Sequence, residues 1–250
     1  MKFIKRLVIV AIVLFIIAII AAVMILPAYL NGIVEQGIET YGPKVTGTTV
    51  TVEKVNLAPF SGSGAVTSLV VANPEGFHTD GAIKVGQAKV KLDPGTLLKD
   101  VVVINDISID GAELTYELGG KGSNIGAIQK HIESVLGQGG GESQTKVVIE
   151  RFSLQNCTVR VGATLLKGKA KTINLPAIEL KDIGRKSSGI TAVEAAAQIM
   201  NHVIGKASKA VVTNGINLPK VKLPNVDNLK NTLQDKIKKP LGKLKGLFGK

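Results

Sequence analysis

The stretch that decides the fold is VVVINDISIDGAELTYEL, residues 101–118. Ile107 and Ile109 alternate with polar residues as far as Asp110, and after Gly111 a second alternating run reaches Leu118. Successive side chains of a strand point to opposite faces, so each run predicts a strand with one apolar face. Asp110-Gly111 is typical of a turn. We therefore expect two strands, joined at this dipeptide and paired antiparallel.

Similar alternation occurs on both sides of this stretch, punctuated by turn motifs such as Asn73-Pro74-Glu75-Gly76. In the run that begins at Val50 the alternation slips by one residue near Lys54. The order of short strands and turns favours meander-like antiparallel pairing. The further strands that we expect are 50–57, 65–71, 83–92, 146–154, 157–166 and 169–175.

Two segments have the periodicity of helices instead. Residues 124–136 place their isoleucines on one face and follow Ser123, a favoured N-cap residue. Residues 191–212 begin with Thr191-Ala192-Val193-Glu194, which fits a capping box. Together with the strands they predict an α+β, β-rich fold in which two helices pack on a mostly antiparallel sheet.

The N-terminal segment predicts a transmembrane helix. Leu7 to Leu26 is an apolar run of 20 residues centred near Phe15, and as a helix it would span about 30 Å, the thickness of a bilayer's hydrocarbon core. A cleaved signal peptide is the alternative, but its apolar region is about 7–15 residues and ends at small residues. Because Lys2, Lys5 and Arg6 precede the run, we expect a cytoplasmic N-terminus and a single pass.

Charge divides the chain into three parts, although the total is +12. Residues 1–30 hold the expected cytoplasmic stub and anchor, with three basic residues and no acidic one. Residues 31–213 are expected to form the β-rich domain, which is close to neutral. Residues 214–250 are strongly basic. Cys157 is the single cysteine, so no internal disulfide forms.

The basic C-terminal segment predicts a linker followed by an amphipathic tail. Residues 217–226, NLPKVKLPNV, read as an extended linker. Beyond it, apolar residues recur every three or four positions with lysines between them, a pattern of segments that lie on anionic membrane surfaces. Packing of this stripe on the domain is the alternative. The expected membrane-surface contacts are Leu233, Lys236, Ile237, Lys238, Lys239, Leu241, Lys243, Leu244, Lys245, Leu247 and Phe248.

The sequence offers no catalytic, metal-binding or cofactor-binding set of residues. His78, His131 and His202 are far apart in sequence, and none lies at ligand spacing from a cysteine or an acidic residue. Asp106 and Asp110 share one face of a strand, but about 13 Å separates them at strand rise. We therefore expect a protein that is not an enzyme. The basic ends do not indicate nucleic-acid binding, because aromatic residues for base stacking are scarce.

An ordered set of local patterns resembles the AsmA-like family of bacterial envelope proteins. The set comprises the apolar anchor, the strand that ends Phe60-Ser61-Gly62, the stretch LVVANPEGF at residues 69–77, Asn124 opening a helix after a glycine pair, and Leu180-Lys181-Asp182-Ile183-Gly184 before the second helix. The likeness covers most of residues 1–212, and the chain is similar to a short, minimal member.

This resemblance implies a curved, groove-like sheet in a periplasmic domain anchored in the bacterial inner membrane. It further implies a part in phospholipid binding or transport during outer-membrane assembly and envelope biogenesis. The alternative is a structural or assembly factor that binds envelope proteins through its tail and has no lipid site. An apolar strand face left uncovered by the helices would distinguish the two, because large exposed apolar patches mark binding sites.

Overall fold

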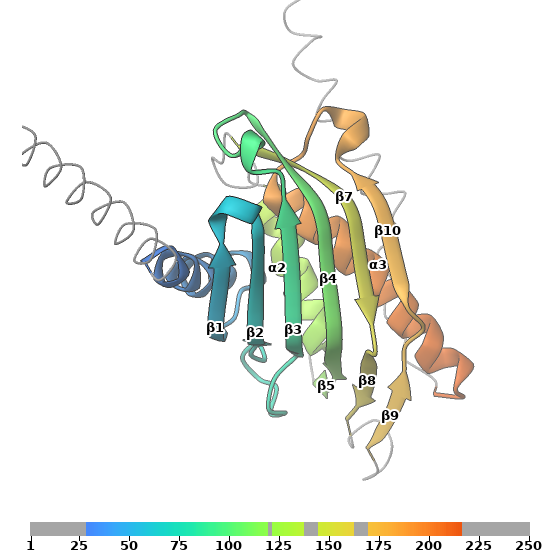
Figure 1. The fold of residues 1–250 in the computed structure, drawn as a ribbon. Coiled ribbons are helices and arrows are strands. Elements are labelled where there is room, and N and C mark those ends of the chain that lie inside the picture. The colour runs from blue at the N-terminus through green and yellow to red at the C-terminus, as the bar shows by residue number, and fades with distance from the viewer. Residues whose placement is uncertain (1–28, 120–121, 138–144, 163–169, 217–250) are drawn as a thin grey trace, which may run out of the picture.

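The computed structural model describes residues 29–119, 122–137, 145–162 and 170–216. These residues form an α+β, β-rich fold in which one large, mostly antiparallel sheet carries helices on one side (Figure 1). The predicted fold class is confirmed at this level. The predicted transmembrane helix and C-terminal tail lie outside the described residues.

The first four strands form an antiparallel meander. They are β1 (Val50–Ala58), β2 (Ser63–Val71), β3 (Ile83–Leu92) and β4 (Val101–Tyr116). The predicted division at Asp110-Gly111 is wrong, because β4 continues through it as one strand of 16 residues. Gly111 takes a φ of 71°, which a turn would also need, but here it serves within the strand.

The second half of the sheet departs from the expected meander. After the short strands β5 (Leu118–Gly119) and β6 (Gly122–Ser123), helix α2 (Asn124–Gly137) returns the chain, and β7 (Lys146–Gln155) pairs parallel to the first part of β4. Strand β8 (Thr158–Val161) pairs parallel to the last part of β4. A strand followed by a helix brings the chain back to the same end of the sheet, so the next strand is parallel.

Two antiparallel strands and one long helix complete the described fold. Strand β9 (Lys171–Asn174) pairs with β8, and β10 (Ile178–Ile183), which the sequence pattern did not reveal, pairs with β7. Helix α3 (Ala192–Thr213) begins with the predicted capping box: the Glu194 N–H donates to Thr191 Oγ1 at 3.2 Å, and the Thr191 N–H donates to Glu194 Oε2 at 2.8 Å.

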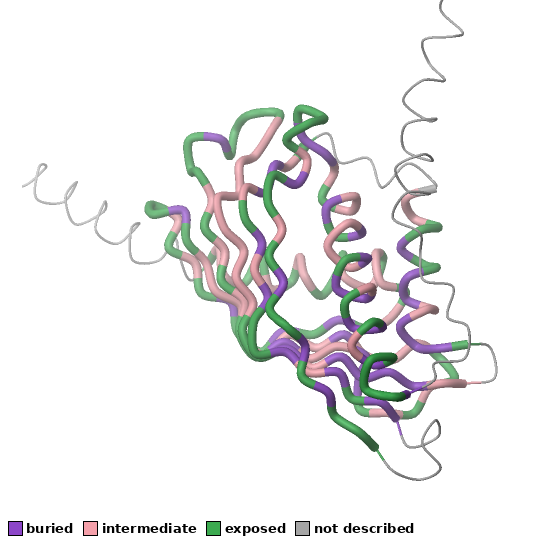
Figure 2. The backbone as a smooth tube through the Cα atoms, turned by 90° about the vertical axis from the view of Figure 1, so that its right-hand side faces the viewer, coloured by how far each residue is buried: buried purple, intermediate pink, exposed green. Residues whose placement is uncertain are grey.

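A line of unpaired residues crosses the sheet and marks where it bends. In each of the ladders β1–β2, β2–β3 and β3–β4, one residue on each strand has no partner on the neighbouring strand. These residues lie in a line across the sheet, which we call the crease. Ser68 and Asn156 take positive φ values of 52° and 53° there. Such irregularities bend strands, and Figure 2 shows the strands changing direction together. The crease consists of Glu53, Ser68, Gly86, Gly111 and Asn156.

Residues 29–46 form a helix along the free edge of β1. The Leu57 N–H donates to Asn31 Oδ1 at 2.8 Å, and the Val52 N–H donates to Glu39 Oε1 at 3.2 Å. The helix therefore follows β1 from its end towards its start, and its side chains satisfy backbone groups that an edge strand leaves unpaired. Within the described ranges, no helix is both long and apolar enough to cross a membrane.

Candidate functional site

One face of the sheet is apolar from β1 to β10. The register places Leu57, Val90, Ile107 and Phe152 in one row across the strands, and parallel rows repeat this on both sides of the crease. We call this the inner face. The other, outer face is polar: Lys89 and Lys91 lie on it beside Ser108 and Asp106.

The helices cover only part of the inner face. Beyond the crease, Val50 and Val71 of the first strands are buried in the core, and a Cβ added at Gly42 of the helix 29–46 would lie 2.8 Å from the Val50 side chain. Figure 2 shows the helices beside this part of the sheet. On the opposite side of the crease, the strand segments 55–58, 63–67, 87–92 and 101–110 form a region that we call the open arm. The inward residues of the open arm are half-buried, apart from the buried Val55: Leu57, Val66, Ala88, Val90, Leu92, Ile104, Ile107 and Ile109.

Part of the open arm is not packed at all against the core of the described residues. Leu57, Val66, Val90 and Leu92 lie outside that core, whereas Ile107 rests on its margin. The neighbours of Val90 in the register are Gly64, which has no side chain, and Ile107. The result is a shallow apolar surface, four strands wide, that is bounded by the crease at one end and by two loops at the other.

These two loops form the tip of the open arm and carry exposed apolar side chains. The first is the 3-10 turn η1 (Pro59–Ser61), where Phe60 is 71% exposed. The second follows the turn η2 (Pro94–Thr96), where Leu97 is 48% exposed and Leu98 is fully exposed. The tip is here defined as Phe60, Leu97 and Leu98.

The outer face of the open arm has a depression of about 510 Å³ that is widely open to solvent. Lys89, Lys91 and Asp106 are among the residues that line it, together with Leu57 and Val90. Asp106 there accepts a hydrogen bond from Arg151 Nε at 2.7 Å, and Asp110 accepts one from Asn156 Nδ2 at 2.8 Å. Both carboxylates, weighed above as a possible acid pair, thus have separate partners on a solvated face.

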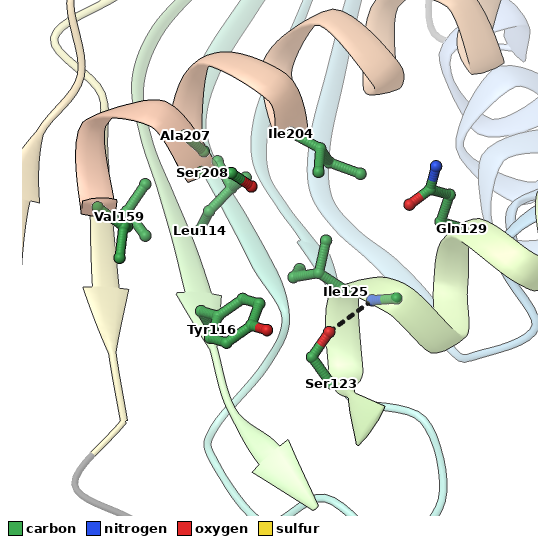
Figure 3. A pocket seen from close by; sticks show the side chains of 11 residues that line it. Leu114, Tyr116, Ser123, Ile125, Gln129, Val159, Ile204, Ala207 and Ser208 are labelled. Carbon is green, nitrogen blue, oxygen red and sulfur yellow. Dashed lines mark hydrogen bonds between the residues drawn. The ribbon is translucent and has the colours of Figure 1, made fainter. Parts of the chain in front are cut away.

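A small cavity lies between the sheet and the helices. Its volume is about 20 Å³, room for about one water molecule. Figure 3 shows Tyr116 reaching into it from β4, opposite Ile125 and Ser123. The Tyr116 hydroxyl has no hydrogen-bond partner among the described residues, although the residue is only 8% exposed. The Ser123 hydroxyl instead accepts the Gly126 N–H at 3.1 Å.

Burial raises the pKa of the Tyr116 phenol above its usual value, and the nearby Ser123 side chain offsets part of that rise. The remaining lining is mostly apolar and comes from both helices, β4 and β8. A cavity of about 20 Å³ has no room for an acyl chain. The open arm is therefore the better candidate for a binding surface.

The Asn-Pro-Glu-Gly stretch is a structural corner. Asn124 is fully buried; its Nδ2 donates to Asn73 Oδ1 at 2.8 Å and to Thr115 O at 2.7 Å. Asn73 in turn donates to Thr79 Oγ1 at 2.7 Å. Phe77 follows the corner and packs on Gly119, where an added Cβ would lie 3.0 Å from its ring. These contacts fix the β2–β3 connection to the start of α2.

Glu117 anchors the same corner with its carboxylate. It accepts the His78 N–H at 2.9 Å, the Thr79 N–H at 2.8 Å and the Thr79 hydroxyl at 2.7 Å. Burial by itself would raise the pKa of Glu117, but these donated hydrogen bonds outweigh it and hold the pKa below its usual value. The sequence offered no signal for this role, because Glu117 ends an ordinary strand pattern.

The other chemistry-bearing residues of the described ranges are dispersed. The His131 ring contacts Lys44 O at 3.1 Å, and the His202 ring contacts Gln198 O at 3.2 Å. Cys157 is buried, and burial raises the pKa of its thiol. No group of three or more histidine, cysteine or acidic side chains close enough to hold a metal ion occurs where the structure is described.

The predicted membrane contacts remain predictions. The anchor residues Leu7, Phe15 and Leu26, and all tail residues from Leu233 to Phe248, lie outside the described residues. Sequence reasoning missed the tip, whose signal was slight: Leu97-Leu98 directly follows a Pro-Gly turn, where polar residues are usual. Neither a protein-family model nor a curated protein sequence matches this chain.

Proposed function

We propose that this chain is a short AsmA-like protein, anchored in the bacterial inner membrane, whose periplasmic domain holds phospholipid acyl chains on the inner face of the open arm. The observation that carries the proposal is the half-buried apolar surface of Leu57, Val66, Val90 and Leu92, which lies outside the main core cluster of the described residues. A contiguous apolar surface that stays partly accessible to solvent is a candidate binding site.

The dimensions of the open arm suit an acyl chain. The six residues of β3 from Gln87 to Leu92 extend roughly 17 Å at strand rise, close to half of the bilayer's hydrocarbon core of about 30 Å. The bound group would meet branched aliphatic side chains and no buried charge. This favours a hydrocarbon over a polar ligand, and it requires no chemical step of the protein.

A second function deserves a test because apolar surface patches also mark sites where proteins bind one another. In this alternative the protein is an assembly factor, and the open arm receives an apolar segment of an envelope protein. A protein segment and a lipid would both dock on Val90, so the experiment has to identify the bound molecule.

The decisive experiment places a photo-crosslinking amino acid at Val90, on the inner face, in the full chain in bacterial membranes. The matched control places it at Lys89, the next residue, which points to the outer face. Crosslinks to phospholipid at position 90 and not at 89 would support lipid holding. Crosslinks at position 90 to a protein would favour the assembly factor, and equal lipid labelling at both positions would refute a lipid-holding face.

A further inference from the structure

The tip of the open arm presents three large apolar side chains that no part of the core accounts for. Phe60, Leu97 and Leu98 are among the most exposed large apolar residues of the described chain. Single exposed leucines are ordinary, but here three apolar side chains occupy two adjoining loops.

The loops hold these side chains outward by a fixed framework. The Leu92 N–H donates to Gly62 O at 2.8 Å and so ties the first loop to the strand that leads into the second. Gly62 takes a φ of 65°, and an added Cβ there would lie 2.2 Å from Leu92 O. Buried Thr96 donates to Asp93 O at 2.7 Å and accepts the Val103 N–H at 3.0 Å, which fixes the turn just before Leu97.

The N-terminal part of the chain enters at this same end of the sheet. Asn31 bonds to Leu57, three residues before Phe60, whereas the later residues of that helix follow β1 away from the tip. The apolar run ends at Leu26, three residues before the first described residue. Three residues reach at most about 10 Å, so chain connectivity requires the run to end close to this end of the domain.

The charges beside the tip nearly cancel. Lys91 and Lys99 flank it, and Asp93 and Asp100 lie next to them in the sequence. Attraction to a membrane at this point would therefore come from apolar insertion rather than from opposite charge. This differs from the predicted lysine-rich tail, whose binding would weaken in salt.

We propose that Phe60, Leu97 and Leu98 insert into the bilayer that holds residues 7–26. The tip of the open arm then lies at the membrane surface. Apolar surfaces that bind at a membrane interface are buried about 5–10 Å into the boundary between headgroups and acyl chains. The proposal rests on the membrane anchor of the proposed function, but it does not require that a lipid enters the open arm.

The test uses the full chain in phosphatidylcholine–phosphatidylglycerol vesicles, in a Cys157→Ala background that leaves one engineered thiol. A polarity-sensitive NBD probe is placed by Leu98→Cys at the tip, by Glu75→Cys at the opposite end of the sheet, and by Phe15→Cys in the anchor. Nitroxide-labelled lipid is the quencher. We expect the probe at position 98 to shift to the blue and to lose about half of its emission or more, while the probe at 75 stays unquenched.

Two further measurements fix the origin of the quenching. The substitution Leu97→Ser, made beside the probe at position 98, should reduce the quenching of that probe. Salt at about 0.5 M should leave the quenching unchanged, because the insertion is apolar. A quenched probe at 15 with an unquenched probe at 98 would overturn tip insertion and keep the anchor. Absence of quenching at both positions would overturn the anchor and the tip insertion together. Lipid crosslinking at Val90 tests the proposed lipid holding separately from tip insertion.

Discussion

At the scale of single residues, buried polar groups divide into those that are satisfied and one that is not. Asn124 and Glu117 each have several hydrogen-bond partners, and both hold the corner after β2 in place. Tyr116, which lies between Thr115 and Glu117 of this network, has none among the described residues. A satisfied buried network specifies one arrangement of the chain, whereas an unsatisfied hydroxyl reduces stability.

Tyr116→Phe is therefore expected to raise the free energy of unfolding by about 1 kcal/mol, because it removes a buried hydroxyl without a partner. Chemical denaturation of the full chain in detergent micelles measures this. Tyr29→Phe is the matched control, since Tyr29 is 67% exposed and should show no change. A loss of stability in Tyr116→Phe would instead indicate a water molecule bound to the hydroxyl in the small cavity.

Glu117 predicts a pH dependence of stability. Its pKa is lower in the folded protein than in the unfolded chain, so the charged form contributes stability above the unfolded pKa of about 4.3. That contribution is lost as the pH falls through the folded pKa. The stability advantage of the wild type over Glu117→Gln should thus be full at neutral pH and shrink below about pH 4.5. An advantage that stays constant down to pH 3 (about one unit below the unfolded value) would contradict this.

At the scale of elements, local patterns predicted the strands better than their pairing. The slip near Lys54 was visible in the sequence, and it is the part of the crease that falls on β1. Gly111 was misread because a glycine with positive φ serves a turn and a bent strand equally well. The parallel pairing of β7 with β4 depends on where α2 returns the chain, which no local pattern encodes.

The candidate site was predictable only in part, for the same physical reason. Alternation along β3 and β4 identified the apolar face that Val90 and Ile107 share. Which half of that face the helices cover is a property of tertiary packing, and it became known only from the structure. Strand β10 escaped detection because Asp182, with a φ of 54°, interrupts its alternation.

Two glycines with equal space around them should respond in opposite ways to replacement by alanine, because one lies in the crease and the other in a helix. An added Cβ would meet nothing within 4 Å at either Gly111 or Gly205. Gly111→Ala should lower stability by about 1 kcal/mol, because its positive φ strains any residue with a Cβ. Gly205→Ala should raise stability by about 1 kcal/mol, because it lies within α3. Thermal unfolding compares both variants, and a stabilising Gly111→Ala would remove the backbone argument for the crease.

At the scale of the whole molecule, the helix 29–46 follows the predicted anchor in sequence and covers the β1 edge of the sheet. Asn31 and Glu39 occupy backbone donors of β1 that would otherwise be free. An uncovered edge strand is a template for pairing with other chains. The same two contacts hold the helix 29–46 along β1.

Asn31→Ala combined with Glu39→Ala should free these backbone groups and speed amide hydrogen exchange at Leu57 and Val52. The exchange rates of amides in β7, away from this edge, should stay unchanged and provide the internal control. Each lost hydrogen bond contributes about 1 kcal/mol, so protection should fall by about fivefold for each. Unchanged exchange at both amides would show that the helix does not bind the edge in solution.

The parallel pairing of β4 with β7 also fixes the order in which the sheet assembles. Val101 pairs with Lys146, far along the chain, while β1 to β4 pair with their immediate neighbours. Closing a longer loop costs more entropy, so the meander should acquire protection before β7 joins. Pulse-labelled hydrogen exchange during refolding measures this, and simultaneous protection would refute it. Until β7 pairs with β4, the apolar segment from Val101 to Ile104 is an unpaired strand edge. We expect the folding protein to be most prone to aggregation during this interval.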